Sequence, residues 1–254
     1  RCPRAFFGRH LRRGLAPSVH GFIRGGTSQR EQIRIGRRSV LLLLPLFVSV
    51  CASPPRGVII LCAGDSLTSK AYPHFLQRLL NEDGIAARVV NYGVTGNTSG
   101  EYLSYLRQPG RAEALMWERP DIILVQLGTN DVRTDGDHLP TERFVANMRQ
   151  ILGYFKGFIS RTADPSRIVL ALVPPVPENT PYPFSPESAR RVREEINPAI
   201  TRLAGEYGLA LVDNYRIFAD RPDLQPGVHP TRDGFRLMAR NWYATVKEIL
   251  KERK

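Results

Sequence analysis

Short apolar runs of strand length recur along the chain from residue 58 onward. The first run, Val58–Ala63, is apolar at every position, which is typical of a parallel strand that is buried on both faces. Four similar runs follow it, at residues 88–92, 122–126, 167–173 and 209–213. The pattern therefore predicts five strands, and each gap between them is long enough for a helix.

Helical periodicity and capping residues fill these gaps. Pro73 suits the first turn of a helix and Gly84 suits a C-terminal cap, because proline fixes φ and glycine tolerates the left-handed conformation. The expected helices are residues 73–83, a segment with Thr141 as its N-cap, a segment that opens at Ser185, and about 233–250. This alternation predicts an α/β fold, a three-layer α/β/α sandwich around a flavodoxin-like, doubly wound parallel sheet of about five strands.

One long connection lacks a helical period. Residues 174–184 contain five prolines, which makes this segment stiff and keeps it at the surface. Because the segment follows a strand, we expect it to form a wall beside a substrate. Tyr182, Phe184 and Trp242 are candidates for substrate contact, although packing in the core or at the surface is the favoured role for Trp242.

Polar blocks follow four of the five predicted strands. The first strand enters Gly64-Asp-Ser-Leu67, the second Gly96-Asn-Thr-Ser99 and the third Gly128-Thr-Asn-Asp131, while Val228-His-Pro230 follows the fifth. Ligands of open α/β sheets bind at the carboxyl ends of the strands, so these blocks are expected to meet at one edge. A serine, a backbone donor, an amide donor and an imidazole base are the groups that acyl transfer needs.

These blocks, in this order, resemble the SGNH hydrolase superfamily, also called GDSL esterases and lipases, over about residues 57–250. The resemblance implies that Ser66 is the nucleophile, that it forms an acyl-enzyme, and that His229 is the base. The oxyanion hole would comprise the backbone N–H groups of Ser66 and Gly96 and the side chain of Asn130. We therefore expect a carboxylic ester hydrolase that needs no cofactor.

Other polar residues near these blocks are expected to have structural roles. Asp65 and Asp131 are placed to accept backbone N–H groups, and Thr98 is placed to form a loop hydrogen bond. Neither His74 nor His138 has a neighbour at metal-ligand spacing, so no metal site is expected.

One position departs from the family pattern. The family has an aspartate three residues before the histidine, where this chain has Pro226. Three explanations are open. Asp223 could take the place of the missing acid, or a backbone carbonyl near Gln225 could orient His229 in a Ser-His dyad. Alternatively, the site is weakened and the domain binds glycans without efficient turnover.

Two further segments bear on the substrate. Val173–Pro177 and Glu195–Ile200 resemble members of the superfamily that deacetylate sugars, which favours short acyl esters on carbohydrate alcohols. A lysophospholipase or arylesterase that acts on longer or aromatic esters is the alternative within the enzyme class. A dinucleotide-binding protein would share the sheet, but the turn after the first strand lacks the Gly-x-Gly-x-x-Gly pattern that a pyrophosphate needs.

The net charge of +12, from 36 Lys and Arg against 24 Asp and Glu, would suggest a nucleic-acid binder. The charge is unevenly distributed. Residues 1–39 hold ten Arg and one acid, a charge of +9, and the remainder holds 26 basic against 23 acidic residues, a charge of +3. A nearly neutral body removes the argument for a nucleic-acid partner, and none is expected.

The basic segment leads into an apolar one. Residues 40–52 form an uncharged stretch of 13 residues, too short to cross a membrane as a helix, which needs roughly 20. A basic flank, a short apolar stretch and a small-residue site indicate a secretory signal, with cleavage after Ala52 or lipid attachment at Cys51 as alternatives. We expect a leader over residues 1–52, a hydrolase domain over residues 53–254, and a periplasmic, cell-envelope or secreted location without a stable membrane span.

Overall fold

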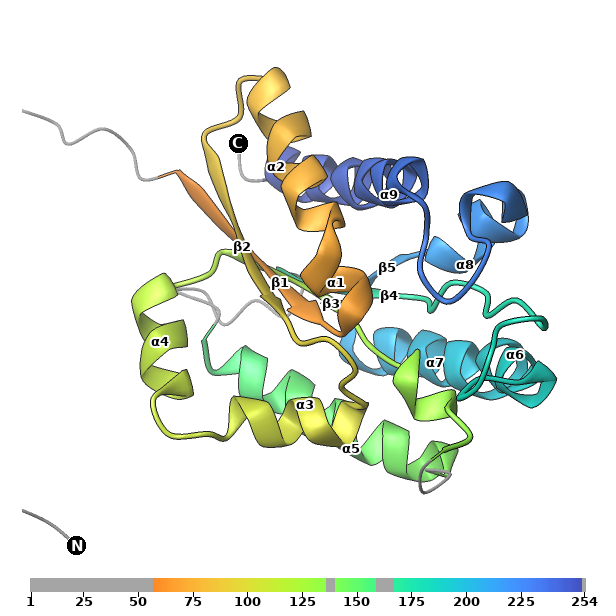
Figure 1. Cartoon of the computed structure of the whole chain (residues 1–254). Helices are drawn as coiled ribbons and strands as arrows, with labels where there is room; N and C mark the ends of the chain where they lie inside the picture. The colour runs from red at the N-terminus through yellow and green to blue at the C-terminus, as the bar shows by residue number, and fades with distance from the viewer. Residues whose placement is uncertain (1–56, 136–139, 159–166, 253–254) are drawn as a thin grey trace, which may run out of the picture. The chain divides into compact units, whose positions relative to one another are not determined.

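The computed structural model describes residues 57–135, 140–158 and 167–252 (Figure 1). The predicted leader and His138 lie outside these ranges, so what the sequence indicates about them stays a prediction. Among the described residues, no helix combines the length and the apolar character needed to cross a membrane.

Five parallel strands form one sheet in the order β2-β1-β3-β4-β5, which is the flavodoxin-like order. The strands are β1 (Val58–Gly64), β2 (Ala87–Gly93), β3 (Ile122–Gln126), β4 (Ile168–Ala171) and β5 (Ala210–Val212). β1 lies between β2 and β3, and its last residue, Gly64, is paired with Gly93 on one side and Gln126 on the other. The predicted fold class is confirmed, although β4 and β5 are shorter than the apolar runs that predicted them.

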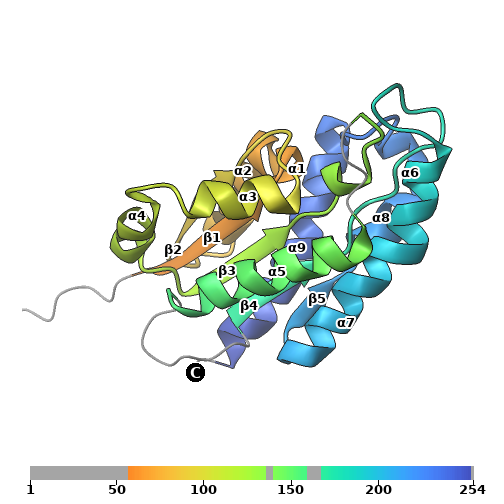
Figure 2. The ribbon, with the colours of Figure 1, turned by 90° about the horizontal axis from the view of Figure 1, so that it is seen from below.

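Helices cover both faces of the sheet. Figure 1 shows β1 and β3 between α2 and α9 on one side and α3, α5 and α7 on the other, and Figure 2 looks onto the second group. The helices are α1 (Ser66–Lys70), α2 (Tyr72–Glu82), α3 (Ser99–Leu106), α4 (Arg111–Glu118), α5 (Thr141–Lys156), α6 (Pro186–Arg191), α7 (Asn197–Tyr207), α8 (Asn214–Ala219) and α9 (Arg232–Lys251). Three short turns also matter, namely the 3-10 turns η1 (Asn130–Val132) and η4 (Pro222–Leu224) and the π-helical turn η3 (Val192–Ile196).

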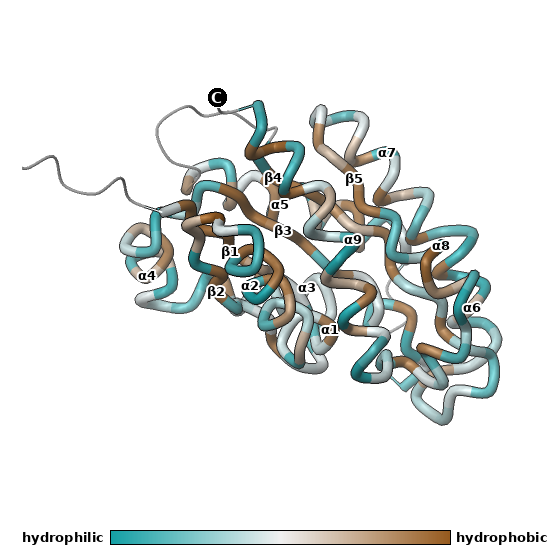
Figure 3. The backbone as a smooth tube through the Cα atoms, turned by 90° about the horizontal axis from the view of Figure 1, so that it is seen from above, coloured by the Kyte–Doolittle hydropathy of each residue, from teal (hydrophilic) through white to brown (hydrophobic). Residues whose placement is uncertain are grey.

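Each face of the sheet has its own hydrophobic core. Successive residues of β1 alternate between them, so that Ile60 and Cys62 join the core under α2 and α9, while Leu61 and Ala63 join the core under α3, α5 and α7. This double burial explains why the strands are continuous apolar runs, and Figure 3 shows them as the brown centre of the fold. Trp242 is fully buried and stacks on Tyr72 with ring centroids 5.7 Å apart, which confirms its expected packing role.

Most of the predicted helix boundaries agree with the structure to within one residue. Ser185 is the N-cap of α6, and its hydroxyl accepts a hydrogen bond from the backbone N–H of Ser188. The prediction that Thr141 is an N-cap is wrong. α5 begins at Thr141 itself, and the Thr141 hydroxyl instead donates to Glu195 Oε2 at 2.7 Å.

Candidate active site

The turn between β1 and α1 presents Ser66 at the edge of the sheet. Asp65 is the N-cap of α1, and its Oδ1 accepts the N–H of Leu67 at 2.9 Å, the structural role expected of it. Gly64 permits the turn because a Cβ atom there would lie 2.2 Å from the carbonyl oxygen of Gln126. Ser66 is therefore the first residue of a helix, where a backbone N–H has no helical acceptor.

His229 contacts Ser66, although the two residues lie near opposite ends of the domain's sequence. The distance from His229 Nε2 to Ser66 Oγ is 2.8 Å, although 163 positions separate the two residues in the sequence. The histidine directly precedes α9, whose N-cap Thr231 accepts the N–H of Gly234. Ser66 is only 5% exposed and His229 is half-buried. This geometry is the one that proton transfer from a serine hydroxyl to a histidine requires.

The segment after β2, residues 94–98, is called the oxyanion loop below, after the role that the sequence resemblance implies for Gly96. It lies beside α1, because the Thr95 hydroxyl is 2.7 Å from the Ser69 hydroxyl. Gly96 has φ +84°, and no atom lies within 4 Å of the position that its Cβ would take. Among the described residues, neither the Gly96 N–H nor the Ser66 N–H has a hydrogen-bond acceptor. Two unpaired donors are thus available for a developing negative charge.

Asn130 joins the oxyanion loop to the end of β3. It begins η1, it is 8% exposed, and its Nδ2 donates to the carbonyl oxygen of Asn97 at 3.0 Å. A side-chain amide has two N–H donors, so this bond leaves one of them for a ligand. Gly128 allows the approach, because its φ is +121° and a Cβ there would lie 2.9 Å from methyl groups of Val173 and Ile196.

Asp131 fixes η1 to the start of α3. Its two carboxylate oxygens accept the backbone N–H of Ser99 at 3.0 Å, and Oδ1 also accepts the Ser99 hydroxyl at 2.5 Å. Burial raises the pKa of Asp131 to about 6, and the hydrogen bonds from Ser99 oppose that rise. Thr98 is the N-cap of α3 and forms a capping box with Glu101. Asp131 therefore has the structural role expected of it, whereas Thr98 caps a helix instead of bonding only within a loop.

Residues 62–237 match the sequence pattern of the GDSL-like lipase/acylhydrolase family, which is 69% of the chain. The chain belongs to this family. The membership confirms the resemblance drawn from the four polar blocks, and the structure shows where each block lies. In this GDSL family protein, the blocks that follow β1, β2 and β3 meet the histidine before α9 at one edge of the sheet.

Two curated relatives have esterase names. An acetylxylan esterase from Xylanibacter ruminicola is 26% identical over 227 residues, which cover 78% of this chain and 45% of that protein. An arylesterase from Vibrio mimicus is 34% identical over 98 residues, which cover 36% of this chain and 46% of that protein. The chain spans less than half the length of the curated relatives it matches.

Solved structures share the fold at low identity. A GDSL-like lipase from Parabacteroides merdae superimposes with a TM-score of 0.62 at 20% identity, covering 75% of this chain and 95% of that one. An acetylxylan esterase from Geobacillus stearothermophilus superimposes with a TM-score of 0.59 at 20% identity, covering 76% and 96%. These likenesses confirm the α/β architecture.

The side of the His229 ring that carries Nδ1, away from Ser66, differs from the family pattern. The structure does not bring Asp223 to it, because both Asp223 carboxylate oxygens accept from Arg221, at 2.9 and 2.7 Å, and the Asp223 side chain is 60% exposed. Across the described parts of the chain, no carboxylate and no carbonyl accepts a hydrogen bond from His229 Nδ1. The structure therefore shows neither Asp223 nor a carbonyl near Gln225 orienting His229, and Ser66 is the hydrogen-bond partner that the described residues provide for the ring.

The structure predicts that Asp223→Asn leaves esterase activity intact. Since its carboxylate binds Arg221 rather than His229, kcat/KM for p-nitrophenyl acetate should stay within about twofold of the wild-type value. Steady-state kinetics of the two proteins make the comparison. A loss of about 100-fold or more would instead place Asp223 beside His229 during turnover.

Burial lowers the pKa of His229, and the positive charge of Lys70 lowers it further. Among the described residues, no carboxylate opposes either effect. The imidazole is therefore neutral at pH 7, which is the protonation state that a general base needs.

The pH dependence of kcat/KM follows from this shift. Activity should rise with pH through a midpoint below 6.5, the ordinary pKa of histidine, and should then stay level toward pH 8. Lys70→Gln should move the midpoint upward, because it removes a nearby positive charge, whereas Lys251→Gln at the far end of α9 should not. A wild-type midpoint above 6.5 would contradict this account, since that is the effect of a carboxylate partner.

The segment 174–184 is bonded to the site at two places, just after η1 and near His229. The N–H and the hydroxyl of Thr134, just after η1, both donate to the Pro183 carbonyl, at 2.7 and 2.9 Å. Near His229, Gln225 Nε2 donates to the Pro175 carbonyl at 2.7 Å. Tyr182 is exposed, but Phe184 is buried in the core, which leaves Tyr182 as the candidate for substrate contact.

Several supporting residues have no motif that points to them. Asn197 is an example, because its side-chain amide bonds both the N–H and the carbonyl of Val173, at 2.8 and 3.0 Å, and so fixes the end of β4. In residues 57–135, 140–158 and 167–252, no group of three His, Cys, Asp or Glu side chains is arranged as metal ligands.

Proposed function

We propose that this protein is a serine ester hydrolase that removes short acyl groups, and that its substrates are O-acylated carbohydrates. The observation that carries the proposal is the 2.8 Å contact between Ser66 Oγ and His229 Nε2, next to two backbone N–H groups without acceptors. Family membership supports the reaction class. The name of one relative, an acetylxylan esterase, supports a small acyl group on a carbohydrate, whereas the name of the other, an arylesterase, matches the alternative of aromatic esters.

The geometry supports a two-step reaction. Ser66 Oγ attacks the ester carbonyl carbon while its proton passes to His229 Nε2. The carbonyl oxygen becomes an oxyanion that accepts from the Ser66 N–H, the Gly96 N–H and Asn130 Nδ2. The intermediate collapses as the C–O bond breaks, His229 returns the proton to the leaving alcohol, and the acyl group stays on Ser66. Water then attacks with His229 as base, which releases the acid and restores Ser66.

A groove beside the site supports a carbohydrate substrate. It lies between α3 and α5, has a cavity volume of about 700 Å³, and begins at Asn97 and Thr98 in the oxyanion loop. Its other polar lining residues are the charged Glu101, Arg107 and Arg143 and the uncharged Ser104, Tyr105, Gln108, Asn147 and Gln150. Hydroxyl and amide groups with an aromatic ring suit a ligand rich in hydroxyls, and the volume is in the usual range of ligand sites.

The acyl preference is tested with p-nitrophenyl acetate, butyrate and octanoate on the full chain. We expect kcat/KM to be highest for the acetate and to fall with chain length. Fastest cleavage of the octanoate would favour a lysophospholipase-type activity instead. Equal inactivity of the wild type and Ser66→Ala on all three esters would favour a glycan-binding domain.

The carbohydrate preference is tested with groove variants. Gln108→Ala combined with Gln150→Ala should raise KM for an acetylated xylo-oligosaccharide about tenfold, as expected for the loss of one or two hydrogen bonds, and should leave p-nitrophenyl acetate hydrolysis unchanged. Asn81→Ala, an exposed amide on α2 across the sheet, is the matched control. If both substrates respond equally, the groove does not bind the sugar.

A further inference from the structure

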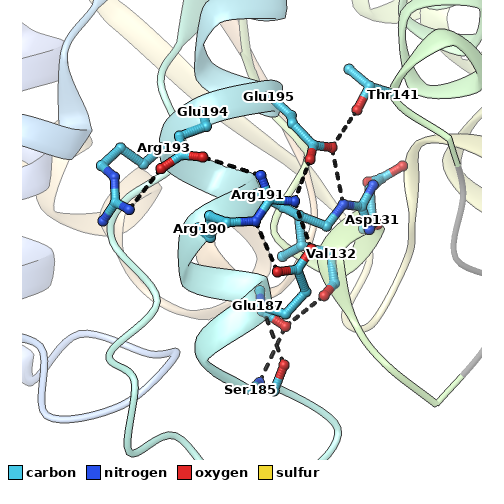
Figure 4. Close-up of polar contacts among 11 residues, drawn as sticks. Asp131, Val132, Thr141, Ser185, Glu187, Arg190, Arg191, Arg193, Glu194 and Glu195 are labelled. Atoms are coloured by element: carbon cyan, nitrogen blue, oxygen red, sulfur yellow. Dashed lines mark hydrogen bonds and ion pairs between the residues drawn. The ribbon is translucent and has the colours of Figure 1, made fainter.

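The backbone of η1 is held from outside the site by α6. Ser188 Oγ donates to the Val132 carbonyl at 2.6 Å, and Arg191 Nη1 donates to the Asp131 carbonyl at 3.3 Å. Figure 4 shows Arg191 beside Asp131 and Val132 of this turn. On its opposite side, η1 is held by Ser99, through the Asp131 carboxylate. The turn that begins with Asn130 is therefore fixed between two helices.

Arg191 is itself held in one orientation. Its Nε donates to Glu195 Oε2 at 3.2 Å, and the same oxygen accepts the Thr141 hydroxyl at 2.7 Å (Figure 4). The Arg191 side chain is only 9% exposed, so its hydrogen bonds compete little with water. The guanidinium thus links η3 to η1 with a planar group whose donors have a fixed geometry, and Glu195 extends this network to Thr141 of α5.

We propose that Arg191 is a positioning residue for the oxyanion hole, which holds the Asn130 amide in place through the backbone carbonyl of Asp131. The inference rests on the proposed function, because it requires an oxyanion at Asn130. Asn130 has to keep one N–H on the Asn97 carbonyl while the other donates to the oxyanion. A turn of three residues does not fix a side chain to that accuracy alone, and a shift of about 1 Å is enough to cost roughly 100-fold in rate.

The neighbouring arginine provides a matched comparison. Arg190 is on the same helix and also binds Glu195, at 2.8 Å, together with Glu187 and Glu194. Its side chain is 43% exposed, and none of its described contacts reaches η1. Loss of either arginine removes one positive charge and ion pairs with Glu195, but only the loss of Arg191 frees the Asp131 carbonyl.

The test compares Arg191→Met with Arg190→Met in the full chain, using steady-state hydrolysis of p-nitrophenyl acetate. We expect Arg191→Met to lower kcat about 10- to 100-fold with KM within about twofold, because the oxyanion forms only after binding. Arg190→Met should stay within about twofold of the wild type. Arg191→Lys should give an intermediate kcat, because one ammonium cannot bond Asp131 and Glu195 in the same geometry.

A double-mutant cycle separates positioning from a general structural role. If Arg191 acts through Asn130, Asn130→Ala combined with Arg191→Met should have the same kcat as Asn130→Ala alone. If Arg191 only stabilises the fold, the two losses multiply and the thermal midpoint falls. Where Arg191→Met does not fold, Ser188→Ala takes its place in the cycle, with an expected several-fold loss of kcat that is likewise absent from the Asn130→Ala background.

Failure of the positioning role and failure of the proposed function give different results. An active wild type, an inactive Ser66→Ala and an Arg191→Met variant with wild-type kcat would overturn the positioning role and leave the proposed function standing. Multiplying losses in the cycle would overturn it as well. Equal inactivity of the wild type and Ser66→Ala would overturn the proposed function, and the positioning role with it.

Discussion

Ser66→Ala should abolish the hydrolysis of p-nitrophenyl acetate, with a loss of about 10⁴- to 10⁶-fold in kcat. The methyl group of alanine cannot attack a carbonyl, and no acyl-enzyme forms. His229→Ala should cause a loss of similar size, because an unactivated serine hydroxyl is a poor nucleophile at neutral pH. Since the two side chains act through one 2.8 Å contact, the double variant should be no slower than either single variant.

Ser69 offers the control for this prediction. It is a second serine on the same short helix, and its hydroxyl faces Thr95 rather than His229. Ser69→Ala should therefore keep kcat within a few-fold of the wild type. Labelling by a serine-directed phosphonate gives an independent measurement, with one label per wild-type chain and none on Ser66→Ala. Unchanged turnover by Ser66→Ala would show that another group is the nucleophile.

The strands could be predicted from the sequence because burial on both faces leaves a physical trace in it. Most residues of β1 and β3 contact one core or the other, so polar residues are absent from most of their length. The end of β4 could not be placed in this way. Val173 is as apolar as the strand before it. Its N–H and carbonyl are bonded by the side chain of Asn197, however, and β4 ends at Ala171.

The short helices had weaker signals. α4 buries only Leu115, so apolar periodicity gives no indication of it. α3 begins at Ser99 behind its N-cap Thr98, whose capping-box spacing to Glu101 is present in the sequence, whereas the prediction for Thr98 is only a loop hydrogen bond. Where a helix is held mainly by its caps, the capping residues predict it better than hydrophobicity does.

The candidate site likewise has a part that the sequence predicts and a part that it does not. The four polar blocks could be identified because each follows a strand or precedes a helix, and the carboxyl ends of parallel strands converge. The supports could not be identified, because Ser188 and Arg191 lie 56 and 60 positions from their acceptors on η1, and no local spacing connects them. Asp223 shows the converse, since it is the nearest carboxylate that precedes His229 in the sequence, yet it is bonded to Arg221 two positions away.

Asn130→Ala should lower kcat for p-nitrophenyl acetate by about 10²- to 10³-fold, equivalent to about 2.7 to 4 kcal/mol of transition-state stabilisation. The two backbone donors remain in this variant, which is why the loss is smaller than that of Ser66→Ala. KM should change little, because the amide bonds the oxyanion more strongly than the ground-state carbonyl. Steady-state kinetics with thermal unfolding as a companion measurement check both points.

The bond from Asn130 to Asn97 requires a second variant. Alanine removes both the oxyanion donor and the connection to the oxyanion loop, so the loss of kcat could reflect a displaced Gly96. Asn130→Asp separates the two effects, because aspartate has the same shape but places acceptors where the donors were. If the amide acts as an oxyanion donor, Asn130→Asp should be slower than Asn130→Ala, since a carboxylate repels the developing charge. If Asn130 only holds the loop, neither variant has a donor for Asn97, and the two should be equally slow.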